Sequence, residues 1–354
     1  MQFAIRYHEF VNVEGEFTQD LPEMINNRAL ILELYQKMVL TRAFDSKAIK
    51  LQRTGKIGTY PSTLGQEAIS VGYGKAMRTD DILVPYYRDY GAQLQRGVSM
   101  VDILSYWGGD ERGSCYAGNT EDFPISVPIA TQNLHAAGVA KAVQHRGEPR
   151  AVLTTLGEGG TSEGDFYEAV NVAGAWQLPL VFVINNNQWA ISVARDVQTG
   201  CETIAQKAIA GGIDGHQVNG NDVLAVYYVV SQALEKARQN QGASVIEAIT
   251  YRLCDHTTAD DASRYRPDTE LQIAWQNEPI TRLKKLLTKH YQWKESDEDA
   301  LQQDCYQQVE HAVKQYLATP RAPVSDMFDY LYANLPKQME AQRETALYYG
   351  ETDD

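Results

Sequence analysis

Residues that could hold a metal ion gather in two short segments of the chain. GEGGTSEGD follows the apolar run 151–156 and contains Glu158, whereas NNNQWAIS follows the apolar run 180–184 and contains Asn187. If a single crossover helix lies between them, both residues fall at the same edge of neighbouring parallel strands. A carboxylate, a carboxamide oxygen and a free backbone carbonyl would converge there. Magnesium and calcium prefer such oxygen ligands.

Glycines in the first segment favour an anionic ligand beside this metal. Gly157, Gly159 and Gly160 let the backbone approach a bulky group, and the amides that open the next helix attract negative charge. Magnesium usually completes its octahedron with water and phosphate oxygens. The sequence therefore predicts a diphosphate that is held through a metal.

Two other phosphate-binding patterns fit less well. A kinase or GTPase phosphate loop requires lysine after its second glycine, but Gly164 is followed by Asp165. A dinucleotide fingerprint requires glycine at Ser162, and Glu158 would face the pyrophosphate without a cation between them. A tight turn with a solvated glutamate is the remaining alternative, and the asparagine segment at the right offset disfavours it.

Two further strand ends supply basic groups. PYYRDYG follows the run 82–84 and places Tyr87 and Arg88 at the rim, where a guanidinium could neutralise the diphosphate charge that one divalent metal leaves over. TYRLCDHTTADD extends past the run 245–250 and offers Arg252 and His256. Imidazole suits proton transfer at neutral pH or donation to phosphate. A solvated arginine and a loop histidine are the alternatives.

The elements that must position these residues form an alternating α/β pattern. Near-continuous apolar or β-branched runs are typical of parallel strands that are buried on both faces. They alternate with helical stretches, so we expect a doubly wound parallel sheet with helices on both faces. The predicted strands are 82–84, 151–156, 180–184 and 245–250, and the predicted helices between them are 134–144, 166–176 and 223–239.

The remaining segments flank this pattern. We expect residues 1–28 to form an arm that packs on something else, and a long amphipathic helix to follow over 28–51. Beyond about residue 270 the strands stop and helices such as 297–317 follow. The predicted division is an N-terminal arm (1–28), a diphosphate-anchoring domain (29–325) and a C-terminal tail (326–354).

Composition excludes several classes of protein. The 46 acidic residues outnumber the 32 basic ones, and the formal net charge of -14 disfavours nucleic acid as a partner. No run approaches the roughly 18 apolar residues of a spanning helix, so we expect no membrane contact. Four dispersed cysteines and the lack of a basic, apolar leader predict reduced thiols and a cytoplasmic location.

The two segments together resemble the thiamin diphosphate motif, whose usual form is Gly-Asp-Gly followed at this spacing by Asn-Asn. TYPSTLGQEA, PYYRDYG, VPIATQ and TYRLCDHTTADD also occur, in this order. Over residues 28–335 the chain is similar to alpha subunits of the decarboxylating first component of 2-oxo acid dehydrogenase complexes. The resemblance implies the thiamin diphosphate-binding fold.

The resemblance also implies roles for individual residues. Magnesium would be bound by Glu158, Asn187 and the carbonyl of Trp189. The residues expected to bind the cofactor are Tyr87, Arg88, Ile129, Gly157, Glu158, Gly159, Gly160, Asn187, Trp189 and His256. VPIATQ resembles a stretch that binds a monovalent cation such as potassium in branched-chain members, which implies Ser126, Pro128, Thr131 and Gln132. Tyr60 and Arg252 are candidate substrate contacts, and His256 is the expected catalytic residue.

The family chemistry implies partners as well. The thiazolium ylide of the cofactor adds to a 2-oxo acid and stores the electrons left by carbon dioxide. A separate beta chain supplies the activating glutamate, so we expect an alpha2beta2 enzyme that acylates the lipoyl domain of an acyltransferase.

The identity of the 2-oxo acid is less clear from the residues. VNVEGEFTQDLPEM and GGTSEGDFYE look more like bacterial pyruvate dehydrogenase members, which makes pyruvate the favoured substrate. Glu158 in place of aspartate, SVPIATQ and NEPITRL look more like branched-chain members. A non-catalytic regulatory subunit on the same fold is a further alternative.

Overall fold

The computed structural model describes residues 4–118 and 121–350. The chain divides into two compact units, with the boundary after Val313. Every predicted site residue lies in the first unit. The predicted division at residues 28 and 325 stays a prediction.

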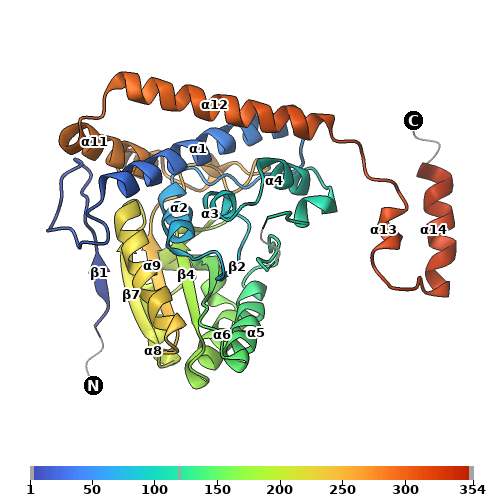
Figure 1. The fold of residues 1–354 in the computed structure, drawn as a ribbon, viewed down its shortest axis with the longest axis horizontal. Coiled ribbons are helices and arrows are strands. Elements are labelled where there is room, and N and C mark those ends of the chain that lie inside the picture. The colour runs from blue at the N-terminus through green and yellow to red at the C-terminus, as the bar shows by residue number, and fades with distance from the viewer. Residues whose placement is uncertain (1–3, 119–120, 351–354) are drawn as a thin grey trace. The chain divides into compact units, whose positions relative to one another are not determined.

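A six-stranded parallel sheet forms the centre of the first unit (Figure 1). Its spatial order is β1-β7-β8-β4-β3-β2, and each neighbouring pair is parallel. The strands are β1 (Arg6–His8), β2 (Ile82–Val84), β3 (Val152–Gly157), β4 (Leu180–Asn186), β7 (Asp214–Asn219) and β8 (Ser244–Ile249). A separate two-stranded antiparallel ribbon joins β5 (Trp189–Ala190) to β6 (Val193–Ala194).

Alternate residues of the central strands face two different hydrophobic clusters. On β3, Leu153 belongs to one cluster and Val152 to the other; on β4, Val181 and Phe182 divide in the same way. Side chains of a strand alternate between the two faces of a sheet, so the sheet is buried on both faces. The predicted doubly wound architecture is confirmed.

Different helices cover the two faces. The first cluster includes residues of α1 (Arg28–Arg53), α2 (Glu67–Ala76), α9 (Val223–Arg238), α11 (Pro279–Tyr291) and α12 (Glu295–Ala318). The second cluster includes residues of α5 (Thr131–Arg146), α6 (Gly164–Ala175) and α8 (Lys207–Ala210). In Figure 1, α2 and α9 lie together beside the sheet, as do α5 and α6. No helix within the described residues is long and apolar enough to cross a bilayer.

Shorter helical segments complete the first unit. These elements are α3 (Tyr90–Gln95), α4 (Met100–Trp107), η1 (Glu111–Ser114), η2 (Glu158–Ser162), α7 (Arg195–Gln198), η3 (Ile204–Gln206), η4 (Ala262–Arg264) and α10 (Asp268–Gln276).

The N-terminal segment differs from its expected role as an arm on another body. It contributes edge strand β1, and buried Asp222 fixes it to the chain's own core. One carboxylate oxygen of Asp222 accepts from the amides of Phe10 (2.7 Å) and Val11 (2.8 Å). The other accepts from Leu224 and Ala225 at the start of α9. A single N-cap aspartate therefore satisfies donors from two distant segments.

The second unit is helical, as the sequence predicts. It contains α13 (Asp326–Asp329) and α14 (Lys337–Gly350), and Arg343 of α14 forms an ion pair with Asp329 at 3.0 Å. The first three residues of the predicted arm and the last four of the predicted tail lie outside the described residues.

All four predicted strands are present. Within the described residues, the six-stranded sheet contains two further strands that were not predicted, and the β5-β6 ribbon was not predicted either. Strand β1 has three residues, and β7 has the polar sequence DGHQVN. The residues of β7 are mostly only partly buried, so β7 lacks the apolar run that marks its neighbours in the sheet. The predicted helices correspond to α1, α5, α6, α9 and α12, with small differences at their ends.

We predict that Gly174→Ala strongly destabilises the fold, because helix α6 packs there without room for a methyl group. A Cβ at this position would lie 1.8 Å from the carbonyl oxygen of Gly211. Backbone must move to relieve this clash, at about 3 kcal/mol of unfolding free energy. The matched control is Gly138→Ala in α5, where no atom lies within 4 Å and alanine should stabilise by about 0.5 kcal/mol. Equal urea midpoints for the two variants would contradict the predicted clash at Gly174.

Candidate functional site

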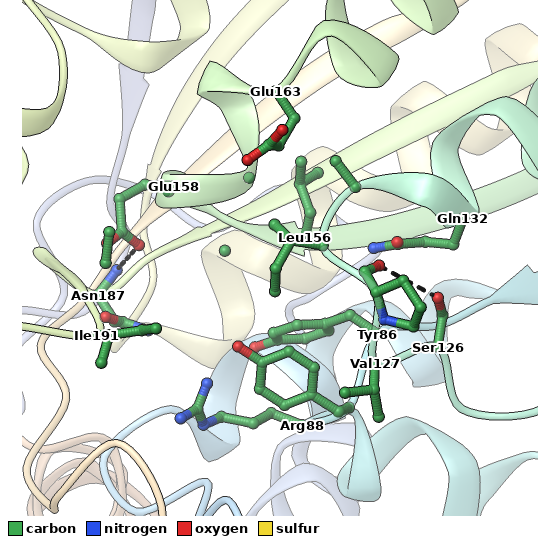
Figure 2. A pocket seen from close by; sticks show the side chains of 18 of the residues that line it. Tyr86, Arg88, Ser126, Val127, Gln132, Leu156, Glu158, Glu163, Asn187 and Ile191 are labelled. Atoms are coloured by element: carbon green, nitrogen blue, oxygen red, sulfur yellow. Dashed lines mark hydrogen bonds between the residues drawn. The ribbon is translucent and has the colours of Figure 1, made fainter. Parts of the chain in front are cut away.

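A cavity of about 200 Å³ opens at the carboxyl edge of strands β2, β3 and β4 (Figure 2). Segment 86–88 follows β2, segment 157–160 ends β3 and turns away from it, and residues 187–191 follow β4. Loop residues 126–130 and His256 close other parts of the wall. The sequence predicts that the ligand-binding residues directly follow the apolar strands, and the cavity lies at that position.

Glu158 and Asn187 lie side by side, as the spacing predicts. Strands β3 and β4 are parallel neighbours with Gly157 opposite Asn185, and α6 forms the single crossover. The backbone amide of Asn187 donates to Oε2 of Glu158 at 3.1 Å (Figure 2). The predicted juxtaposition of the two residues is confirmed.

The other carboxylate oxygen of Glu158 is the most unusual atom of the site. Glu158 is 1% exposed, and its Oε1 is buried without a hydrogen-bond partner among the described residues. Burial raises the pKa of Glu158 to about 6, although Arg252 and Arg88 oppose this shift. A buried acceptor without a partner is costly. This oxygen is therefore available to a cation.

The carboxamide of Asn187 is held in one orientation. Its Nδ2 donates to Oε1 of buried Gln66 at 3.0 Å, and its Oδ1 accepts from the amide of Trp189 at 3.2 Å. The second lone pair of Oδ1 remains free for a ligand. Sequence reasoning missed Gln66, which lies in the GQEA segment directly before α2.

Two arginines surround the ring of His256. Nη2 of Arg88 lies 3.1 Å from Nδ1 of His256 and also donates to the His256 carbonyl, while Nη1 of Arg252 lies 3.4 Å from the same Nδ1. Burial and these two guanidinium charges lower the pKa of His256 to about 3. A guanidinium can only donate, so Nδ1 accepts and the ring proton resides on Nε2. In the chain without an anion His256 is therefore a neutral ring, whose Nε2 proton suits donation to phosphate.

The guanidinium groups themselves are buried positive charges. Arg88 is 2% exposed and Arg252 is fully buried, and neither forms an ion pair within the described residues. Arg88 donates to the carbonyl of Ser62 at 3.0 Å. Buried charges without a counter-charge are costly, so an anion in the cavity would stabilise both arginines.

Arg252 does not line the cavity, contrary to its expected role as a substrate contact. Its guanidinium donates to the carbonyls of Trp189 (3.3 Å) and Ile191 (2.7 Å) and to the hydroxyl of Tyr265 (2.8 Å). Arg252 thus holds the backbone of the segment after β4 from a position outside the cavity lining.

The glycine turn packs tightly against the same segment. A Cβ on Gly159 would lie 2.6 Å from Cβ of Ala190, whereas a Cβ on Gly157 would meet no atom within 4 Å. Close contact between the two turns therefore requires glycine at Gly159. Gly160 lines the cavity beside Leu156.

The loop predicted to bind a monovalent cation also reaches the cavity. Ser126, Pro128 and Gln132 line it, but Thr131 does not. Nε2 of buried Gln132 donates to the Thr155 carbonyl at 2.7 Å, and its Oε1 is buried without a partner among the described residues. The hydroxyl of Ser126 lies 3.5 Å from the Pro128 carbonyl. Ser126, Pro128 and Gln132 thus belong to one cavity wall.

Tyr60 lies outside the cavity, so the lining does not support it as a substrate contact. Its side chain is fully buried, and its hydroxyl donates to Asp45 at 3.0 Å. The ring stacks on Tyr90 with centroids 5.2 Å apart. The sequence could not distinguish this packing role from a substrate contact, because the hydrogen bond to Asp45 depends on the position of α1 in the folded chain.

The remaining predicted residues line the cavity. Tyr87 and Ile129 are in its wall, and the guanidinium carbon of Arg88 lies 4.9 Å from the ring centre of Tyr87. Sequence reasoning missed seven further lining residues of the described chain. They are Tyr86, Val127, Ala130, Leu156, Glu163, Ala190 and Ile191.

Comparison with known proteins identifies the family. The chain matches the dehydrogenase E1 component family over residues 35–325. The chain belongs to the dehydrogenase E1 component family. The predicted family is confirmed, and the matched E1 region contains every predicted site residue. The protein is thus a component of a 2-oxo acid dehydrogenase.

Individual E1 relatives divide between two activities. The chain is 35% identical over 340 residues to the pyruvate dehydrogenase E1 component subunit alpha of Bacillus subtilis, covering 95% of this chain and 91% of the relative. It is 38% identical over 331 residues to the 3-methyl-2-oxobutanoate dehydrogenase subunit alpha of Mycobacterium tuberculosis, covering 94% and 89%. The pyruvate dehydrogenase E1 component subunit alpha of Staphylococcus epidermidis is 36% identical over 328 residues, covering 92% and 88%.

We predict that Glu158→Gln stabilises the metal-free protein and flattens its pH dependence. The pKa of Glu158 is about 6 in the folded chain and near 4.3 when unfolded, so the folded state binds more protons between these values. The stability of the wild-type protein therefore falls as the pH rises through this window. Above pH 6 the variant should be more stable by about 2 kcal/mol, and below pH 4 the gain should vanish. Urea unfolding in the presence of a chelator measures this difference, and a gain that is independent of pH would contradict it.

Proposed function

We propose that this chain is the alpha subunit of a thiamin diphosphate-dependent pyruvate dehydrogenase, which decarboxylates pyruvate oxidatively and passes the acetyl group to lipoyl-lysine. The observation that carries this proposal is the buried, unpartnered Oε1 of Glu158 beside Asn187 in the cavity. The cofactor supplies a thiazolium carbanion that adds to the 2-oxo group and accepts electrons as carbon dioxide leaves. Family membership and the pyruvate dehydrogenase relatives support the assignment.

Magnesium fits the oxygens that this chain presents. No group of three His, Cys, Asp or Glu that could hold a metal occurs within residues 4–118 and 121–350. The carboxylate of Glu158 would therefore share the ion with Oδ1 of Asn187, the carbonyl of Trp189 and phosphate oxygens. Such a mixed set is typical of magnesium, which keeps ligand phosphates and waters in its octahedron.

Arg88 and His256 would bind the diphosphate. The guanidinium of Arg88 supplies charge, and the neutral ring of His256 supplies the Nε2 proton as a hydrogen-bond donor. The glycine turn and Tyr87 complete this wall. His256 would also stand close to the acyl group during its transfer to lipoyl-lysine.

A potassium ion would fit the loop over residues 126–132. Oε1 of Gln132, the Pro128 carbonyl and the Ser126 hydroxyl offer neutral oxygens, and the first of these is buried without a partner in the described chain. Thr131 opens α5 at the end of this loop and would contribute from there. The ion would hold the loop, and with it Ile129, against the cofactor.

A beta subunit is needed to complete the enzyme. Apolar residues at the rim are exposed, with Val127, Ile129 and Ile191 about half accessible. Exposed apolar groups around a binding cavity are typical of an interface. We infer an alpha2beta2 assembly in which the beta chain covers this rim and supplies the glutamate that activates the cofactor. The lipoyl domain of the acyltransferase would then enter from the open side.

A branched-chain 2-oxo acid dehydrogenase is the second candidate. The Mycobacterium tuberculosis relative named 3-methyl-2-oxobutanoate dehydrogenase is 38% identical, slightly more than the pyruvate dehydrogenase relatives. A regulatory subunit without activity is disfavoured, because Glu158, Asn187, Arg88 and His256 all line one cavity.

We predict that Glu158→Ala abolishes magnesium-dependent retention of thiamin diphosphate and leaves the fold intact. The variant loses the only carboxylate of the proposed metal site, and a lost metal ligand should weaken cofactor binding by more than about 100-fold. Glu168→Ala is the matched control, since it removes the same charge from an exposed position one turn into α6. Calorimetric titration of both variants measures cofactor binding. Retention by Glu158→Ala at the level of the control would refute the metal site.

We also predict that the purified chain is inactive alone and gains activity with its beta partner. The reconstituted enzyme should turn over pyruvate faster than 3-methyl-2-oxobutanoate by at least tenfold in kcat/KM. Decarboxylation of each acid with an artificial electron acceptor measures both values. The reverse preference would assign the branched-chain activity, and full activity of the chain by itself would refute the two-chain site.

A further inference from the structure

A tyrosine and a glutamate outside the cavity hold the segment that would bind the metal. The indole Nε1 of Trp189 donates to the hydroxyl of Tyr251 at 3.0 Å, and this hydroxyl donates to Oε2 of Glu270 at 2.9 Å. Neither Tyr251 nor Glu270 lines the cavity. The side chain of Trp189 is therefore held by Tyr251 outside the cavity, while its backbone carbonyl belongs to the proposed metal site.

The backbone around Trp189 requires such an anchor. Gln188 has a φ of +72° and Ile191 a φ of +54°, in the left-handed region that side chains rarely adopt. A β-branched residue is strained there. Strained residues persist only where their surroundings fix them, and they cluster at functional sites. Two of the contacts that fix this segment are the indole of Trp189 with Tyr251 and the carbonyl of Ile191 with Arg252.

Tyr251 is well placed to act as this anchor, because the chain beyond β8 continues alongside the chain beyond β4. The amide of Thr250 donates to the Asn186 carbonyl at 2.8 Å, and the amide of Arg252 donates to the Asn187 carbonyl at 3.2 Å. Tyr251 lies between these two contacts. The hydroxyl of Tyr251 thus accepts from the indole on one side and donates its own proton to Glu270 on the other.

We propose that Tyr251 and Glu270 are positioning residues that orient the Trp189 turn for metal binding. The inference rests on the proposed magnesium site and deepens it. Residues that orient metal ligands through hydrogen bonds usually contribute about 10-fold to 100-fold in metal affinity. The indole donor is specific to tryptophan, so the arrangement gives the Trp189 side chain a function beyond its carbonyl.

The test uses the enzyme assembled with its beta partner, and titrates Mg²⁺ by calorimetry at saturating thiamin diphosphate. Tyr251→Phe removes the central hydroxyl and should weaken Mg²⁺ binding about tenfold. At saturating Mg²⁺ its kcat should stay within about twofold of wild type, because no group that contacts the cofactor is lost. Trp189→Phe keeps the carbonyl, should weaken Mg²⁺ binding equally, and should add nothing when combined with Tyr251→Phe.

Two further variants separate positioning from general destabilisation. Glu270→Gln still accepts from the tyrosine and should retain Mg²⁺ affinity, whereas Glu270→Ala should lower it. The matched control is Tyr35→Phe. Tyr35 donates to Glu298 at 2.7 Å, and Glu298 also accepts from Trp293 at 3.0 Å, in a similar cluster that is not part of the cavity. This control should bind Mg²⁺ as wild type does.

The outcomes distinguish this inference from the proposed function. Mg²⁺ binding by Tyr251→Phe equal to that of Tyr35→Phe would overturn the positioning role and leave the metal site standing. Losses that multiply in the double variant of Trp189 and Tyr251 would also overturn it. If the wild-type enzyme binds thiamin diphosphate without any dependence on Mg²⁺, both the metal site and the positioning role are refuted.

Discussion

A buried carboxylate with one unpaired oxygen is the constraint on which the rest of this site depends. Oε2 of Glu158 accepts from the amide of Asn187, but Oε1 has no partner within the described residues. Folding alone gains nothing from this arrangement, since burial raises the pKa of Glu158 and destabilises its charged form. Its location is explained if a cation completes the coordination. The sheet, the glycine turn and the asparagine segment together keep that oxygen inside the cavity.

The buried charges of the site are consistent with a metal diphosphate as the missing group. Glu158 contributes one negative charge, while Arg88 and Arg252 contribute two positive charges and His256 is neutral. A divalent cation with a fully ionised diphosphate carries one net negative charge. Adding it makes the sum of these charges zero. A metal alone would leave three positive charges in a buried place, and a diphosphate alone would face Glu158 without a cation.

The sequence predicts those parts of this structure that have a local hydrophobic pattern, and it does not predict those that depend on tertiary contacts. Strands β3 and β4 are continuous apolar runs, so their ends could be found, and with them Glu158 and Asn187. Strand β7 is polar and largely part-buried, and its place depends on pairing with β8. The fully buried position of Tyr60 results from its contacts with Asp45 and Tyr90, which are made by tertiary packing. The protonation state of His256 likewise depends on two arginines that come from different strand ends.

The roles of Gln66, Arg252 and Tyr251 follow from one geometric feature of the site. The ligands come from turns after strands, and a turn offers its carbonyls and amides to a ligand only if its backbone is not paired in the sheet. Such a turn must be held by side chains from its neighbours. Gln66 holds the carboxamide of Asn187, Arg252 holds two carbonyls, and Tyr251 holds the indole of Trp189. These supporting residues do not line the cavity. A search for reactive residues passes over Gln66 and Tyr251, and it assigns Arg252 to the substrate instead of to this supporting role. The three-dimensional contacts are needed to recognise that the site consists of ligands and of the residues that orient them.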